Sequence, residues 1–208
     1  MTVALDLADA LDATLAGRRS IRTYEERSVE PALLERVLAA ATHAPSPHHS
    51  IPWRLAVLTG DAAKQKLAQA MADKWRADLL ADGLPEAEVE LELAKSWKRL
   101  TASPVVLVGS VYPERLDEYP DPERQAAETL MASHSLGAAL QNIMLAAHAN
   151  GLASCWMCAP VFCSEVVRDA LGLEQGLYPH AIVTIGYAAR PPRARQRPSV
   201  DEIVSLRA

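Results

Sequence analysis

Three kinds of signal are missing from this sequence of 208 residues, and each absence removes a class of protein. Its nine glycines form neither a G-x-G-x-x-G nor a G-x-x-x-x-G-K motif, so neither a Rossmann dinucleotide site nor a P-loop is indicated. No apolar run approaches the roughly 18 residues of a membrane span. The first residues lack the basic and apolar segments of a signal peptide. We therefore expect a cytoplasmic protein with no membrane partner.

Cysteine is scarce, and the three that occur are Cys155, Cys158 and Cys163. An odd number this small excludes a disulfide framework. The first two have C-x-x-C spacing, but they follow an apolar segment rather than opening a helix, where reactive thiols are usually found. The pattern therefore predicts buried structural cysteines.

Positive charge is not in excess, since 21 Lys and Arg stand against 26 Asp and Glu, for a net charge of −5. A general nucleic-acid binder needs a basic face, so no nucleic-acid partner is expected. A chain of this length is typical of one domain, and we expect a single domain over 1–208.

The spacing of apolar residues predicts helices and short strands in an order that lacks regular βαβ alternation. Helices are expected over 2–17, from Pro31, and over 62–80, 86–100, 124–150 and 161–171. Strands are expected over 53–58, 104–112, 152–157 and 181–188. This mixture predicts an α+β fold in which a small sheet is wrapped by helices. The polar tail, 189–208, is expected to lie across a partner subunit.

Two basic clusters are candidates for binding an anion. The run 18–22, Arg-Arg-Ser-Ile-Arg, offers three guanidinium groups and a hydroxyl that together can enclose a phosphate. Near the C-terminus, Arg193, Arg195 and Arg197 alternate and so share one side of an extended segment. A solvated turn and a solvated tail are the respective alternatives.

A stiff loop precedes the first expected strand, because residues 43–52 hold three prolines and three histidines. The spacing of His43, His48 and His49 matches no standard zinc pattern, so no metal is predicted. The functional interpretation is that one histidine hydrogen-bonds a planar ligand, since rigid loops often carry ligand contacts. The alternative is a surface loop.

The order of these motifs resembles the nitroreductase family of FMN-dependent oxidoreductases. Arg-Arg-Ser-x-Arg is followed by Ala-Pro-Ser-x5-Pro-Trp, Gly-Leu-x-Ser-Cys-Trp, Ile-Gly-Tyr and a late Arg-Pro, over about residues 15–204. The resemblance implies an α+β fold with a small central mixed or antiparallel sheet. It also implies an intertwined homodimer with two FMN sites at the subunit interface, and a C-terminal segment that crosses to the partner.

The resemblance further implies a cofactor site built from four stretches. The first basic run would hold the FMN phosphate, ribityl chain and pyrimidine edge, and the proline-rich loop would reach the flavin from the other subunit. The backbone near the second Trp of the motifs would face the flavin ring, and the late basic pair would sit at the phosphate end. The implied contacts are Arg18, Arg19, Ser20, Arg22, Pro45, Ser46, His49, Trp156, Met157, Arg195 and Arg197. The flavin N5 would carry the hydride, with His48, His49 or water as the candidate proton donors.

The sequence is more similar to one branch of this family than to the others. His49 and Ile51 replace the usual Asn and Gln, and segments 73–79 and 82–85 are similar to the C-terminal flavin domain of the bacterial coenzyme F-420 γ-glutamyl ligase. This similarity implies reduction of a dehydro precursor of that coenzyme, with the ligase as a separate partner. Segment 71–100 would form a lid, and Lys74, Trp75 and Arg76 would meet the substrate.

Two other functions stay open. One is a general nitro- or quinone reductase that uses NAD(P)H, and the other is a flavin- or deazaflavin-binding module without turnover. The candidate electron donors are NAD(P)H and a reduced deazaflavin.

Overall fold

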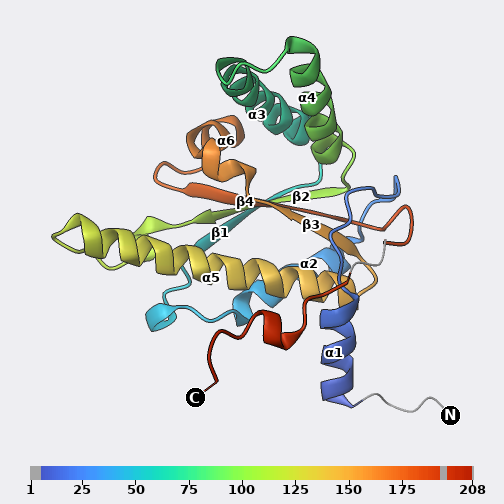
Figure 1. The fold of residues 1–208 in the computed structure, drawn as a ribbon, viewed down its shortest axis with the longest axis vertical. Coiled ribbons are helices and arrows are strands. Elements are labelled where there is room, and N and C mark those ends of the chain that lie inside the picture. The colour runs from blue at the N-terminus through green and yellow to red at the C-terminus, as the bar shows by residue number, and fades with distance from the viewer. Residues whose placement is uncertain (1–5, 193–195, 208) are drawn as a thin grey trace.

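The computed structural model describes residues 6–192 and 196–207, which fold into a four-stranded sheet with helices on both faces (Figure 1). The strands are β1 (Trp53–Leu58), β2 (Val105–Val111), β3 (Ala153–Met157) and β4 (Tyr178–Gly186). The α-helices are α1 (Leu7–Gly17), α2 (Pro31–Ala39), α3 (Asp61–Ala81), α4 (Glu86–Thr101), α5 (Pro122–Ala149) and α6 (Ser164–Leu171). The expected α+β fold is confirmed. No helix in these ranges is both long and apolar enough to cross a bilayer.

The sheet is antiparallel throughout and has the order β1-β2-β4-β3. Every residue of β2 is buried, because β2 is a central strand with helices over both of its faces. Its near-continuous apolar sequence is what this position requires, since a strand covered on both sides has no solvent face.

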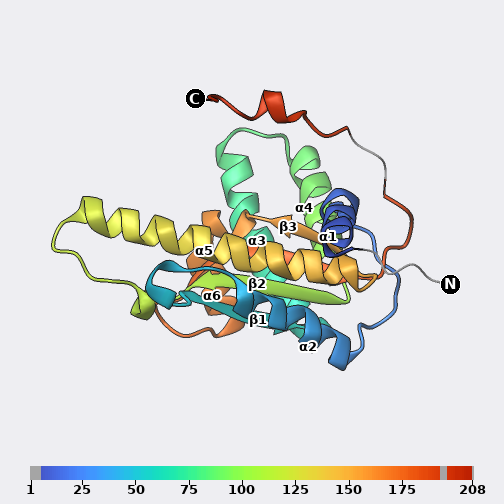
Figure 2. The ribbon, with the colours of Figure 1, turned by 90° about the horizontal axis from the view of Figure 1, so that it is seen from below.

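Alternate residues of the central strands feed two separate cores. Leu107 and Val183 point into the core beneath α2 and α5, whereas Val108 and Ile182 point into the core beneath α3 and α6. Figure 2 shows α5 running along one face of the sheet, with α3, α4 and α6 on the other side. The inner face expected for the long helix is confirmed, because Leu136, Leu140, Ile143, Met144 and Ala147 are all buried.

The strand expected over 181–188 in fact spans 178–186. Proline normally argues against a central strand, because it has no N–H to donate. Here Pro179 pairs with Ser110 and Ala181 pairs with Gly109, so His180 is an extra residue at a β-bulge. The bulge lies beyond the end of β3, where proline costs no ladder bond on that side.

Two helix predictions also need correction. The helix expected over 161–171 is split into a 3-10 turn, Ala159–Phe162, and α6, with Cys163 between them. Within the described residues α1 begins at Leu7 and buries none of its side chains, so Leu7, Leu11 and Leu15 stay exposed.

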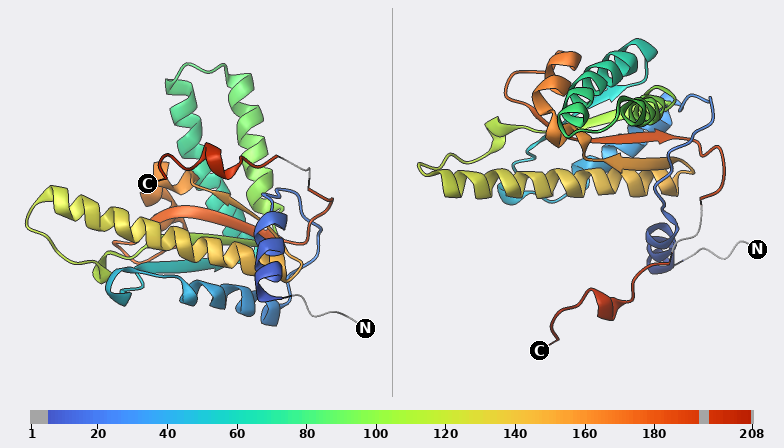
Figure 3. Two further views of the ribbon diagram at one scale, coloured as in Figure 1. Left: turned by 60° about the horizontal axis from the view of Figure 1, so that its bottom comes forward. Right: turned by 45° about the horizontal axis from the view of Figure 1, so that its top comes forward.

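Helices α3 and α4 pack side by side and project from the sheet (Figure 3).

Two glycines give a test of this packing with opposite signs. A Cβ at Gly186 would lie 2.8 Å from Pro104, so Gly186→Ala should lower the free energy of unfolding by about 1–3 kcal/mol through overpacking. A Cβ at Gly137, inside α5, meets only Trp156 at 3.5 Å. Gly137→Ala should therefore raise the free energy of unfolding by up to about 1 kcal/mol through helix propensity. Urea denaturation measures the free energy of unfolding of both variants, and equal effects of the two substitutions would contradict the close contact between Gly186 and Pro104.

Candidate functional site

The segment that follows α1 covers the free edge of β3. The N–H of Ile21 donates to the carbonyl of Ser154 at 2.9 Å, and Ser20 forms a parallel bridge with Ser154. Further on, Tyr24 forms an antiparallel bridge with Ala188. The run 18–24 therefore passes from the face of the sheet covered by α5 to the face covered by α4, and it carries its basic side chains to both.

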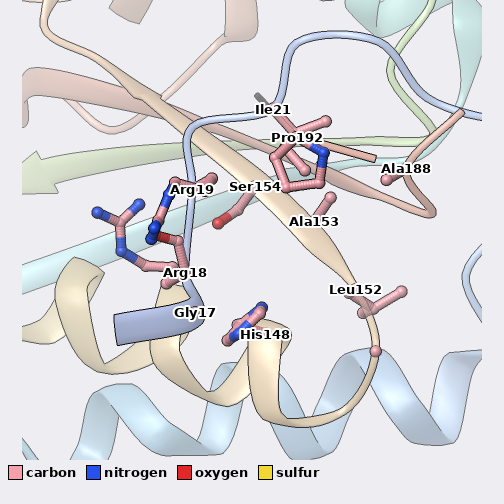
Figure 4. Close-up of a pocket in the computed structure, with 11 residues that line it drawn as sticks. Gly17, Arg18, Arg19, Ile21, His148, Leu152, Ala153, Ser154, Ala188 and Pro192 are labelled. Atoms are coloured by element: carbon pink, nitrogen blue, oxygen red, sulfur yellow. The ribbon is translucent and has the colours of Figure 1, made fainter. Parts of the chain in front are cut away.

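On the α5 side lies a cavity of about 210 Å³, here called the Arg18 pocket (Figure 4). Arg18 and Arg19 line it together with His148 from the last turn of α5 and the first residues of β3. The backbone of Gly17 packs against His148, because a Cβ there would lie 2.6 Å from the imidazole Nε2. His148 was not expected here from the sequence, since no motif linked the end of the long helix to the basic run.

Arginines from the two ends of the chain meet at Arg18, which lines this pocket. Arg197 Nη2 donates to the carbonyl oxygen of Arg18 at 3.2 Å, and Arg19 Nη1 donates to the same oxygen at 2.9 Å. Burial, and then the charges of Arg197 and Arg19, hold the pKa of Arg18 below its usual value. Like charges are thus gathered where an anion would relieve them. Arg195, expected beside Arg197, lies outside the described residues.

On the α4 side lies a cavity of about 480 Å³, here called the basic pocket. Arg22 is one of its lining residues, together with side chains from α4 and from the segment after β4, which the sequence had not connected. The lining consists of Arg22, Thr23, Tyr24, Lys95, Lys98, Arg99, Ala102, Ala189 and Arg190.

Tyr24 holds this region to the sheet rather than offering a reactive group. Its hydroxyl donates to the carbonyl of Ile21 at 2.6 Å and lies 2.7 Å from the hydroxyl of Thr184. Burial raises the pKa of Tyr24 far above its ordinary value, so the phenol stays protonated.

The proline-rich loop is held in a strained backbone conformation. His48, His49 and Ile51 all have positive φ, at 50°, 56° and 50°, which is uncommon for residues other than glycine. The Ser46 hydroxyl accepts the N–H of Ile51 at 3.1 Å and so closes the loop. Strain of this kind is frequent at functional sites.

Within one chain the loop does not reach the Arg18 pocket. Pro45 and Ser46 line a separate hollow with Met131, His134 and other residues of α5. His48 and His49 are exposed beside it. The basic run and the loop therefore lie in different places on the same molecule.

The end of β3 presents the remaining residues of the site. Trp156 and Met157 are half-buried and pack against opposite cores, and the Trp156 indole N–H has no partner among the described residues. Cys155 is buried, and burial raises the pKa of its thiol against the opposing charges of Arg22, Arg99 and Arg18. The expectation that Cys158 is buried is wrong, because β3 ends at Met157 and the chain turns outward there.

The segment proposed to meet the substrate lies in the middle of α3. Lys74 forms an ion pair with Asp78, and Arg76 forms one with Glu90 of α4. Trp75 is 37% exposed. Both cations therefore already have carboxylate partners, and the Arg76 pair ties α3 to α4.

Comparison with known proteins gives this geometry its context. The family described as "Nitroreductase family" matches residues 15–187. The chain belongs to the nitroreductase family. Within it, the NADH dehydrogenase of Thermus thermophilus is 29% identical and the alignment covers 100% of both chains. Nitroreductase NfnB of Mycolicibacterium smegmatis is 28% identical over 82% of this chain and 80% of its own.

A solved structure shares the fold. The FMN-dependent nitroreductase NfnB from Mycobacterium smegmatis, in complex with NADPH, aligns with a TM-score of 0.71 at 24% identity. The alignment covers 98% of this chain and 100% of that one. Among the residues described here, no three His, Cys, Asp or Glu side chains are grouped as a metal site requires.

The strain in the loop can be measured at His48. A left-handed conformation costs roughly 1–2 kcal/mol for a residue with a Cβ, and the extra unfolded-state entropy of glycine offsets roughly 0.5–1 kcal/mol of that. His48→Gly should therefore raise the free energy of unfolding by about 0.5–1 kcal/mol. His48→Ala keeps the Cβ and should leave it unchanged. Denaturant unfolding compares the two, and an equal effect of both would show that the backbone is relaxed.

Proposed function

We propose that this chain is an FMN-dependent oxidoreductase that passes electrons from NAD(P)H to an electron-poor small molecule. The observation that carries the proposal is the gathering of Arg18 and Arg19 at one pocket with Arg197 in contact with Arg18. Within residues 6–192 and 196–207, none of the three forms an ion pair with a carboxylate. A phosphate is the anion that this donor set suits best.

The donor set fits the phosphate end of FMN. Guanidinium groups bind phosphate through paired N–H donors, and Arg197 approaches from the C-terminal segment while Arg18 and Arg19 approach from the end of α1. His148 adds a further N–H donor at the same pocket. When bound, FMN supplies the two-electron chemistry of the reaction, which these side chains cannot supply themselves.

The other residues of the chain position the ligand. Ser20 lies between the two pockets and is the candidate for the ribityl chain, and Arg22 is the candidate for the pyrimidine edge. The backbone at Trp156 and Met157 would lie along the ring, and the half-buried indole would exclude water from it. Arg195 completes the proposed phosphate contacts.

A second copy of the chain is part of the proposed site. The proline-rich loop, with Pro45, Ser46 and His49, would reach the flavin of the partner, since it does not approach the Arg18 pocket of its own chain. Exposed apolar residues on α1 and on the C-terminal segment provide the surface for such a dimer. The tail, 189–208, would cross to the partner.

The physiological substrate is a finer proposal. Reduction of a dehydro precursor of coenzyme F-420, made with a separate ligase, rests on the similarity of the loop and of segments 73–79 and 82–85. Lys74 and Arg76 support it less than expected, because both are ion-paired. General nitro- and quinone reduction, with α3 and α4 as the lid, fits the geometry equally well. Single turnover of dithionite-reduced enzyme with the precursor or with a nitrofuran, followed by mass spectrometry, separates the two.

Cofactor binding tests the proposed function. The purified protein should be yellow, and Arg19→Ala should weaken FMN binding by about 1.5–3 kcal/mol through loss of a charge-assisted phosphate contact. Arg36→Ala removes an exposed Arg of α2 and serves as the matched control. Fluorescence titration with FMN gives the dissociation constants. A colourless wild-type protein that takes up no FMN would refute the proposal.

The dimer is tested at the α1 surface. Leu11 lies on α1, which buries none of its side chains in the single chain, so Leu11→Glu should leave the monomer folded. In a dimer the new charge would be buried without a partner, so the substitution should yield a monomer with weakened FMN binding. Leu91→Glu alters an equally exposed leucine on α4 and should remain dimeric. Light scattering gives the mass and circular dichroism verifies folding. A monomeric wild-type protein with FMN bound would contradict the shared site.

A further inference from the structure

The basic pocket has a lining of unusual charge. Five of its nine lining residues are cationic and none is acidic, and they come from three segments that are distant in the sequence: 22–24, 95–102 and 189–190. Ligand cavities are usually lined by apolar side chains with only a few polar groups, so convergence of five cations from three segments needs a physical reason.

Most of these charges have no counter-ion among the residues that the structure describes. Lys95 pairs with Glu92 at 2.6 Å. In the two ranges that the structure describes, no ion pair involves Arg22, Lys98, Arg99 or Arg190. Lys98 and Arg99 lie in the last turn of α4, where cations interact favourably with the helix dipole. These two positions alone would therefore require no ligand.

Arg22 and Arg190 cannot be explained in that way. Tyr24 and Ala188 form an antiparallel bridge, and the N–H of Ala189 donates to the carbonyl of Thr23 at 3.2 Å. Just beyond this bridge the chain bends at Ala189 and Arg190, and Arg190 lines the same cavity as Arg22. Like charges gathered around one cavity repel each other. An anion bound between them would turn this repulsion into attraction.

The cofactor phosphate does not account for this pocket. Arg18, Arg19 and Arg197 already provide for one phosphate at the Arg18 pocket on the other face of the sheet edge. The two pockets share the run 18–24, so a ligand in the basic pocket lies next to the bound cofactor rather than at a remote surface.

We propose that the basic pocket binds a phosphate or carboxylate group on the molecule that exchanges electrons with the cofactor, and that Arg99 and Arg190 select for this charge. The inference rests on the proposed function and names the substrate class of the same site. The anionic group can belong to the reductant, as in a phosphorylated nicotinamide nucleotide, or to the oxidant. The chemistry of recognition is the same in both cases.

Direct binding is the first test and does not depend on turnover. Calorimetric titration of the FMN-loaded protein with inorganic pyrophosphate reports on the basic pocket, since FMN fills its own phosphate site. Arg99→Ala with Arg190→Ala should weaken pyrophosphate binding by about tenfold to a hundredfold, because each lost charge-assisted contact is worth about tenfold. Lys66→Ala, an exposed cation of α3 outside the pocket, should have no effect. Unchanged affinity in the double variant would overturn the inference.

Two kinetic arms identify the source of the charge. The reductive arm compares NADPH with NADH in stopped flow, and the oxidative arm mixes dithionite-reduced enzyme with 4-nitrobenzoate or the neutral 4-nitrobenzamide. Preference for the more highly charged member of a pair in one arm, lost in the double variant while the less charged member reacts as before, supports the inference and assigns the group. Equal effects on both members of each pair in both arms overturn it, even if pyrophosphate binds.

Melting temperatures give a second test of anion binding that does not depend on turnover. Without an anion, Arg190→Ala should raise the melting temperature by about 1–3 °C, because it removes one of the five like charges gathered around the pocket. Phosphate, compared with chloride at equal ionic strength, should raise the melting temperature of the wild type more than that of the variant. If the double variant does not fold, Arg99→Gln and Arg190→Gln are measured singly. Failure to take up FMN would refute the proposed function and the electron-exchanging role of the ligand, whereas pyrophosphate affinity that is equal in wild type and double variant would refute anion binding by the basic pocket itself.

Discussion

Closure of the β3 edge by the segment after α1 is the constraint on which the rest of the site depends. An open edge strand presents unpaired N–H and C=O groups, and here the hydrogen bond from Ile21 to Ser154 satisfies part of that edge. The same contact holds residues 18–24 at the border between the two faces of the sheet. Because the segment crosses that border, Arg18 and Arg19 line the pocket by α5 while Arg22 lines the pocket by α4.

Repulsion between cations is the second organising feature. At the Arg18 pocket the charges of Arg197 and Arg19 add to burial in lowering the pKa of Arg18, and at the basic pocket five cations line one cavity. By contrast, Lys74 and Arg76 of α3 are paired with Asp78 and Glu90. Among the described residues, most of the cations that line the two pockets have no such carboxylate partner. That contrast is what points to anionic ligands at the edge.

The surfaces left exposed in the single chain belong to the same arrangement. The loop with His48 and Ile51 keeps a strained backbone, and it stands away from the pocket it is proposed to complete. The leucines of α1 find no core of their own. A sheet of four strands with well-filled cores on both faces has no need of these elements for stability, so their features are more readily explained by contacts with a second copy.

Sequence alone determined the elements whose signal is local. Apolar periodicity placed β1 at its observed residues and predicted the buried face of α5, because burial repeats with the period of the backbone. Motif order predicted the family, and with it Arg18, Arg19 and Arg197 as one cluster. Local rules failed where neighbours in space override them: Pro179 is tolerated only because β3 stops short of it, and Cys158 is exposed because its strand has ended.

Only the tertiary structure decided which charges stay uncompensated. Lys74 and Arg76 looked available in the sequence, but Asp78 lies one helical turn from Lys74, and the packing of α4 on α3 brings Glu90 to Arg76. No motif linked Lys98, Arg99 and Arg190, but the fold brings them to Arg22 around one cavity. The Arg76 ion pair and this cavity depend on distances between segments far apart in the chain, and neither composition nor spacing encodes those distances.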